Sequence, residues 1–255
     1  MKLQKVTRWQ ASGLHLLISA AIAAAALALM LLVWYPHPLF QAAGGDDLLL
    51  ILVGVDVILG PLITLIIFRQ GKKGLKLDLA VIGAVQLAAL VYGVGIVYLA
   101  RPAFIVFVKD RFEVATAVEL EPGELAKAKR PEFSRPPVFG PRWAYGEFPT
   151  DQGERSKLVD QALAGRDLQH FPQYFRPYEE ARAEILARAQ PIARVRATEP
   201  KAAPVVDAWL ASSGTREDAV RYLDLRAPRS WVAVLVDAQT ARPVKMLIYE
   251  RIAKP

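Results

Sequence analysis

Three long runs of apolar residues dominate the first hundred positions of the chain. Residues 15–35 and 79–99 contain no Lys, Arg, Asp or Glu, and residues 48–68 contain a single acid, Asp56. Each run is about 20 residues long, which at a rise of about 1.5 Å per residue matches a bilayer core of roughly 30 Å. We therefore expect three N-terminal transmembrane α-helices rather than three core helices of a soluble fold.

The short charged segments beside these runs predict the orientation. The leader, residues 1–13, and the second connection, residues 69–78, carry Lys and Arg, whereas the first connection, residues 36–47, carries only acids. Because basic segments stay on the cytoplasmic side, the N-terminus is expected in the cytoplasm and the first connection outside. A transmembrane domain of residues 14–100 then leaves residues 101–255 outside, which in a bacterial inner membrane means the periplasm.

A cleaved signal peptide is the competing interpretation of the first run. Small-residue patterns occur around residues 24–28, but they lie inside the run, and apolar residues continue to Tyr35. A signal peptide has a shorter apolar core with its cleavage site at the end. We therefore favour a retained helix.

Composition removes several classes of function. The chain has 0 cysteines, so disulfides, thiolate metal sites and cysteine nucleophiles are excluded. Part of the formal net charge of +7 lies in the basic segments beside the apolar runs, and the rest is spread among the acidic and basic residues after residue 100. No nucleic-acid partner is therefore expected.

After Arg101 the pattern changes to that of a folded aqueous domain. Alternating residues predict strands at 104–108 and 112–118, and a closing hairpin of residues 231–236 and 244–249. The proline-rich and aromatic stretch 131–149 is expected to be extended and pinned against the domain. Strands and helices together predict a periplasmic α+β domain.

Three helices are expected in that domain. The first begins at Asp151, with Glu154 as its capping partner, ends at Gly165, and is expected to bury Leu158, Val159, Ala162 and Leu163. The second has Pro177 at its first position, and its buried stripe is expected at Ala181, Ile185, Leu186 and Ala189. The third is short, at residues 204–212.

The search for catalytic and metal-binding motifs is negative. There is no nucleophile elbow, no HExxH and no pair of histidines at ligand spacing. His37 and His170 are interpreted as structural, Ser212-Ser213-Gly214 as the end of a helix, and Gly71-Lys72-Lys73-Gly74 as an ordinary loop. We expect a non-enzymatic protein with no catalytic residue, cofactor or metal.

The second apolar run carries the strongest functional signal. Asp56 is an acid inside a predicted span, where a charge is costly. Gly60 and Thr64 follow at intervals of four residues, so the three share one helical face, and Pro61 is expected to bend the helix. Small residues on such a face allow close helix approach.

The third run has a matching face with Gly83, Gln86, Leu90 and Gly93. If the second and third helices are antiparallel, Tyr92 is expected near the depth of Asp56, and Gln86 near that of Pro61. Three interpretations remain open: packing within one subunit with Asp56 protonated or bonded to Tyr92, docking of a partner helix, and a proton or ion pathway.

Three stretches resemble a known family. DVILGPLITLIIF (56–68), LKLDLAVIGAVQLAALVYG (75–93) and RPAFIVFVKDRFEV (101–114) are similar to the TfpX/TfpZ type IV pilin accessory proteins, as is the closing AVLVDAQTARPV (233–244). Ala241 departs from that pattern, because a turn glycine is expected there. The matching positions are Asp56, Gly60, Pro61, Thr64, Lys76, Asp78, Gln86, Tyr92, Gly93, Arg101, Pro102, Asp110, Arg111 and Phe112.

The resemblance implies an inner-membrane factor that promotes the assembly of one type IV pilin without joining the fibre. Its implied partners are the major pilin, the pilus assembly platform and the lipid bilayer. A pilin has Glu as the fifth residue after the glycine at which its leader is cleaved. The fifth residue after Gly13 is Ile18, so the chain is not expected to be a pilin itself. A membrane-anchored periplasmic sensor or ligand-binding protein, and a membrane enzyme, are the alternatives from other classes.

Overall fold

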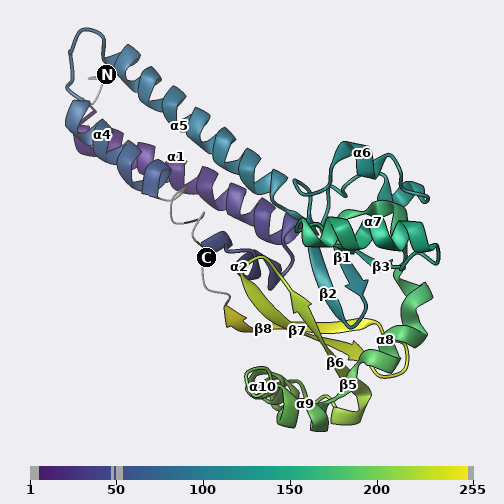
Figure 1. The fold of residues 1–255 in the computed structure, drawn as a ribbon. Coiled ribbons are helices and arrows are strands. Elements are labelled where there is room, and N and C mark those ends of the chain that lie inside the picture. Colours follow the sequence, from purple (N-terminus) through teal and green to yellow (C-terminus); the bar gives the residue numbers. More distant parts are fainter. Residues whose placement is uncertain (1–5, 47–48, 50–53, 252–255) are drawn as a thin grey trace. The chain divides into compact units, whose positions relative to one another are not determined.

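The computed structural model describes residues 6–46, 49 and 54–251, and the chain folds into two compact units (Figure 1). One unit is helical, and the other is built on a β-sheet. The helical unit comprises Met1–Val33 and Gly45–Leu99, and the sheet unit comprises Trp34–Gly44 and Ala100–Pro255.

The helical unit contains two helices that are long and apolar enough to cross a membrane. Helix α1, Arg8–Leu29, continues as π-helix through Met30–Trp34, and helix α5 covers Leu75–Leu99. Thr7 begins α1 with a capping box, in which its hydroxyl accepts from the Gln10 amide at 3.2 Å. These helices correspond to the first and third predicted runs.

The second run forms a shorter described helix. A π-helical segment, Gly54–Leu59, leads into α4, Gly60–Ile67, with Pro61 in its first turn. Proline lacks the amide that would continue an α-helical hydrogen-bond ladder, and the irregular segment lies directly before it. The beginning of the predicted span, residues 48 and 50–53, falls outside the described residues.

The second unit contains a mixed eight-stranded sheet. Its order is β4-β3-β1-β2-β6-β7-β8, with β5 pairing to β6. β1 pairs antiparallel to β2 and parallel to β3, whereas β2 meets β6 through only two parallel residue pairs. The strands are β1 Pro102–Val108, β2 Arg111–Thr116, β3 Arg142–Gly146, β4 Phe175–Pro177, β5 Gln190–Pro191, β6 Val220–Arg226, β7 Ser230–Asp237 and β8 Pro243–Arg251.

Alternating side chains bury both faces of this sheet. Ile105 and Phe107 of β1 lie in one core with Val234 of β7, while their neighbours Phe104 and Val106 point to the opposite face. The covering helices are α6 Pro122–Leu125, α7 Gln152–Leu163, α8 Arg182–Arg188, α9 Ile192–Thr198 and α10 Ala203–Ser213 (Figure 1). The mixed α/β sheet domain that the sequence predicts is therefore present.

Most of the first connection between the apolar runs, up to Gly44, belongs to the sheet unit. It carries the short helix α2, Leu39–Ala42, whose Leu39 and Ala42 are fully buried in the core beside β7. The Ala42 carbonyl accepts a hydrogen bond from the Arg229 amide at 2.9 Å. A segment expected to be only an outer loop is thus part of the domain's core.

Several local predictions are confirmed and others are wrong. Asp151 caps α7 by accepting from the Glu154 amide at 2.8 Å, but of the predicted apolar face only Leu158 is buried, whereas Val159 and Leu163 are exposed. Pro177 ends β4 and caps the 3-10 helix Tyr178–Ala181, which leads into α8, so the predicted helix begins one residue later and not as α-helix. Ala181, Ile185 and Ala189 of its predicted stripe are buried. The stretch 131–149 contains a 3-10 turn and β3, so it is a sheet strand as well as a pinned segment.

Candidate functional site

The polar residues of the helical unit meet in its interior. Thr64 of α4 is 2 % exposed, and its hydroxyl lies 2.6 Å from Nδ1 of His15 on α1. One turn earlier, the Ser12 hydroxyl donates to the Pro61 carbonyl at 2.9 Å. Two hydrogen bonds therefore fix α4 against α1, and neither was evident from the sequence because both α1 partners lie in or beside an apolar run.

Gln86 of α5 reaches the same region from the other side. Its Nε2 donates to the main-chain carbonyl of Asp56 at 3.0 Å, inside the π-helical segment. In a π-helix the carbonyl of residue 56 would accept from the amide of residue 61, but Pro61 has no N–H to donate. A Cβ built at Gly60 would lie 2.5 Å from Cδ of Gln86, so the absence of a side chain at Gly60 makes room for the amide.

A cavity of about 150 Å³ adjoins these residues. It is lined by His15, Ile18, Ser19, Ile22, Asp56, Gly83, Gln86, Leu87 and Leu90, all of the helical unit. Asp56 is 8 % exposed, and its Oδ1 and the Oε1 of Gln86 have no hydrogen-bond partner among the described residues. The cavity therefore combines apolar walls with unsatisfied acceptors.

The structure brings together most, but not all, of the predicted intramembrane residues. Asp56, Gly60, Pro61, Thr64 and Gln86 form one contiguous set. Tyr92, expected near the depth of Asp56, is 72 % exposed, and the α5 residue that bonds to the Asp56 main chain is Gln86, which also lies against Gly60 beside Pro61. Gly93, one turn beyond Leu90 on α5, is half-buried.

The membrane-proximal motif residues serve local structure. Asp78 pairs with Lys72 at 2.6 Å at the start of α5, where Lys76 is exposed. Arg101 is 4 % exposed and donates through Nε to the Pro137 carbonyl at 3.1 Å, directly before Pro102 begins β1.

The β1–β2 turn holds the remaining motif residues. Asp110 and Arg111 pair at 3.0 Å, and the Arg111 guanidinium also lies over the Trp231 ring at 5.8 Å. Phe112 is fully buried, with its ring edge-on to Trp143 at 5.1 Å between centroids. Phe112 is thus part of the sheet unit's core, whereas Asp110 and Arg111 form a pair at its surface.

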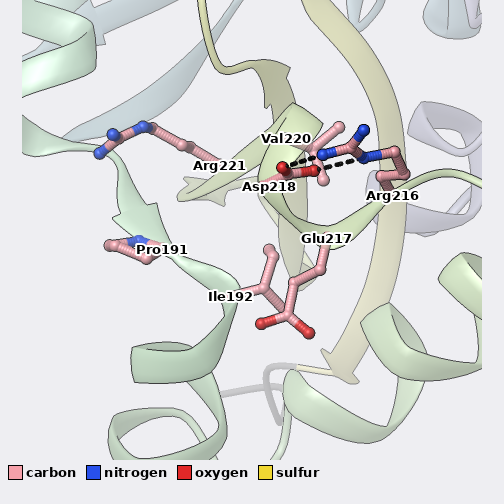
Figure 2. A pocket seen from close by; sticks show the side chains of 7 residues that line it. All are labelled: Pro191, Ile192, Arg216, Glu217, Asp218, Val220 and Arg221. Atoms are coloured by element: carbon pink, nitrogen blue, oxygen red, sulfur yellow. Dashed lines mark hydrogen bonds and ion pairs between the residues drawn. The ribbon is translucent and has the colours of Figure 1, made fainter.

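A larger pocket of about 570 Å³ lies on the sheet unit near β5 and β6 (Figure 2). Three of its four charged side chains are in ion pairs: Arg216 binds Asp218 at 2.9 Å, and Glu217 binds Arg196 at 2.8 Å. The fourth, Arg221, donates to the Ala189 carbonyl at 3.5 Å. Figure 2 shows the Arg216–Asp218 pair turned toward each other rather than toward a free centre. Paired surface charges of this kind give no specific site.

Metal-ligating side chains do not cluster in the part of the chain that the structure describes. No group of three or more His, Cys, Asp or Glu residues there could hold a metal ion. The predicted helix end at Ser212-Ser213-Gly214 is confirmed, since Gly214 caps α10 with a φ of 67°. His37 is exposed, and His170 lies in a 3-10 turn.

Fold and site together define a class: an α/β sheet protein joined to apolar helices, with its distinctive polar site among those helices. Comparison with known proteins gives the family. A profile described as "Fimbrial assembly protein FimB" matches residues 4–44. The chain is 34% identical over 185 residues, 72% of each chain, to the "Fimbrial assembly protein, serogroup I" of Dichelobacter nodosus, and 33% identical over 185 residues to its serogroup E1 counterpart, with the same coverage.

The chain belongs to the fimbrial assembly protein family. A third relative, the "Fimbrial assembly protein, serogroups C1 and C2" of the same organism, is 36% identical over 119 residues, 46% of this chain and 91% of the relative. No solved structure matches the chain significantly. The family points to a role in pilus assembly rather than catalysis.

Proposed function

We propose that the protein is an inner-membrane accessory factor that binds a type IV pilin and promotes its assembly, acting as a non-catalytic chaperone. The observation that carries this proposal is the similarity to fimbrial assembly proteins over 185 residues, which extends well beyond the apolar N-terminus.

The sheet unit is formed by two separate segments of the chain, and this supports a three-span topology. Trp34–Gly44 and Ala100–Pro255 share one folded core, so they must lie on the same side of a membrane. If α5 crosses the bilayer between them, the chain from Gly45 to α5 must cross it as well. Together with α1 this makes three spans, and the basic leader then favours a periplasmic position for the sheet domain.

The two units suit the two parts of a membrane-held pilin. Gln86 and His15 of the same chain already cover Gly60 and Thr64, so the pilin's apolar helix would meet the cavity that Asp56 lines. The sheet domain would meet the pilin's periplasmic head. Three chain connections join the units, at residues 33/34, 44/45 and 99/100. Tethering raises the effective concentration of the second contact, so each contact can be weak and reversible, as release of a client requires.

An affinity pull-down of the full-length protein from gently solubilised native membranes, read by mass spectrometry, tests the proposal. A pilin is expected as the dominant partner. Recovery of assembly-platform proteins without pilin would place the function in the assembly machine instead, and recovery of neither would leave chaperone activity without support.

The intramembrane cavity is tested by Asp56→Leu. This variant is expected to stay in the membrane fraction and to recover several-fold less pilin. Ile58→Leu, an apolar change at an exposed position two residues away, is the matched control and should recover as much pilin as the unaltered protein. Equal recovery by both variants would remove this cavity from the proposal.

A further inference from the structure

The cavity between α1, the π-helical segment Gly54–Leu59 and α5 contains buried oxygen atoms that accept no hydrogen bond from the part of the chain that the structure describes. Asp56 Oδ1 and Gln86 Oε1 are both buried without a partner among the described residues. The amide orientation of Gln86 follows from its bond to the Asp56 carbonyl, which only the NH2 group can make. Buried oxygens without donors destabilise a structure, so a ligand that supplies donors is favoured there.

The cavity also lacks a positive side chain. Neither Lys nor Arg is among its lining residues, and Nδ1 of His15 already faces the Thr64 hydroxyl. An ionised Asp56 would therefore be a single negative charge in an apolar surrounding. Ser19, 7 % exposed on the α1 wall, adds a hydroxyl group that can accept a hydrogen bond and is not itself among the unpartnered atoms.

We propose that this cavity binds a primary ammonium group on a hydrocarbon stem. An ammonium has three hydrogen-bond donors and one positive charge. The donors match the oxygens of Asp56, Gln86 and Ser19, and the charge matches the Asp56 carboxylate. Ile18, Ile22, Leu87 and Leu90 supply the apolar wall for the stem. Binding of an ammonium does not depend on the proposed function. The identity of the molecule that carries the ammonium does: under the proposed function, it is the N-terminal or lysine ammonium of the partner's membrane segment.

The full-length protein in detergent micelles, titrated with n-butylammonium chloride at fixed pH and ionic strength, tests the chemistry. Two readouts are used: the midpoint of thermal unfolding, and labelling of Asp56 by dicyclohexylcarbodiimide, followed by peptide mass spectrometry. Butylammonium is expected to raise the midpoint by several degrees and to reduce labelling several-fold. Tetramethylammonium and sodium chloride, which have no N–H donors, are expected to do neither.

Asp56→Asn should abolish the butylammonium response, and Asp78→Asn, which removes an acid outside the cavity, should keep it. If Asp56→Asn fails to fold, protection of Asp56 in the unaltered protein from dicyclohexylcarbodiimide by butylammonium still tests the proposal. An equal response to sodium would make this a general cation site, and no response to butylammonium would overturn the proposal. A butylammonium response without pilin in the pull-down would contradict the proposed function alone.

Discussion

Gln86 fills the space that a side chain at Gly60 would need. A Cβ at Gly60 would lie 2.5 Å from Cδ and 2.7 Å from Oε1 of Gln86, well inside van der Waals contact. The amide can stay only because position 60 has no side chain. This pair therefore sets how closely α4 and α5 approach in the helical unit.

Gly60→Ala is expected to lower the free energy of unfolding by about 1–2 kcal/mol, because the Gln86 amide must leave the Asp56 carbonyl. The measurement is thermal or denaturant unfolding of the purified protein in detergent. In a Gln86→Ala background the same change should cost much less, since the clash is gone. Gly13→Ala, with nothing within 4 Å, is the control and should be neutral or slightly stabilising.

Leu39→Ala is expected to destabilise the sheet unit by about 2–4 kcal/mol, because Leu39 is 1 % exposed in its core. Near-ultraviolet circular dichroism of the full-length protein follows that unit, which contains Trp143 and Trp231. Leu32→Ala, at a position 83 % exposed, is the matched control and should change little. Similar transitions for both variants would contradict the placement of α2 in the core.

Ala241→Val is expected to cost about 2 kcal/mol or more. Ala241 has a φ of 61° and is fully buried, and a β-branched side chain is strained in that backbone region. Ala241→Gly relieves the backbone but loses a buried methyl, so it should stay within about 1 kcal/mol of the unaltered protein. Chemical denaturation of the three proteins side by side makes the comparison, and equal stability of the Val variant would refute the strained turn.

Glu113 is expected to make the sheet unit less stable as pH rises. Burial raises the pKa of Glu113 to about 7, although Arg226 and Arg111 oppose the shift. The unfolded state loses its proton near pH 4.5 and the folded state near 7, so stability falls between these values, by up to about 3 kcal/mol. Unfolding measured from pH 4.5 to 8 should show this fall.

Glu113→Gln is the comparison that isolates the effect, because other carboxyl groups titrate in the same window. The variant should lose this part of the pH dependence and be more stable than the unaltered protein at pH 8. A variant that keeps the same slope would show that the Glu113 side chain is solvated in the folded protein.

Local sequence patterns predicted several elements correctly. The alternation at residues 104–108 and 112–118 gave β1 and β2, and Asp151 with Glu154 marked the start of α7. Such features depend on neighbours within a few residues, so one stretch of sequence carries enough information. The family resemblance, rather than a local pattern, implied a turn glycine at 241, and Ala241 has a positive φ.

The sequence by itself determined the apolar helices and the pairing of near neighbours into hairpins, because charge, hydropathy and turn chemistry act locally. Only the tertiary structure decided that Leu39 lies in the sheet core and that Gln86, not Tyr92, meets Asp56. The physical reason is that burial of a loop and the register between helices depend on packing between distant segments, and a π-helical segment before Pro61 shifts that register in a way that no periodicity predicts.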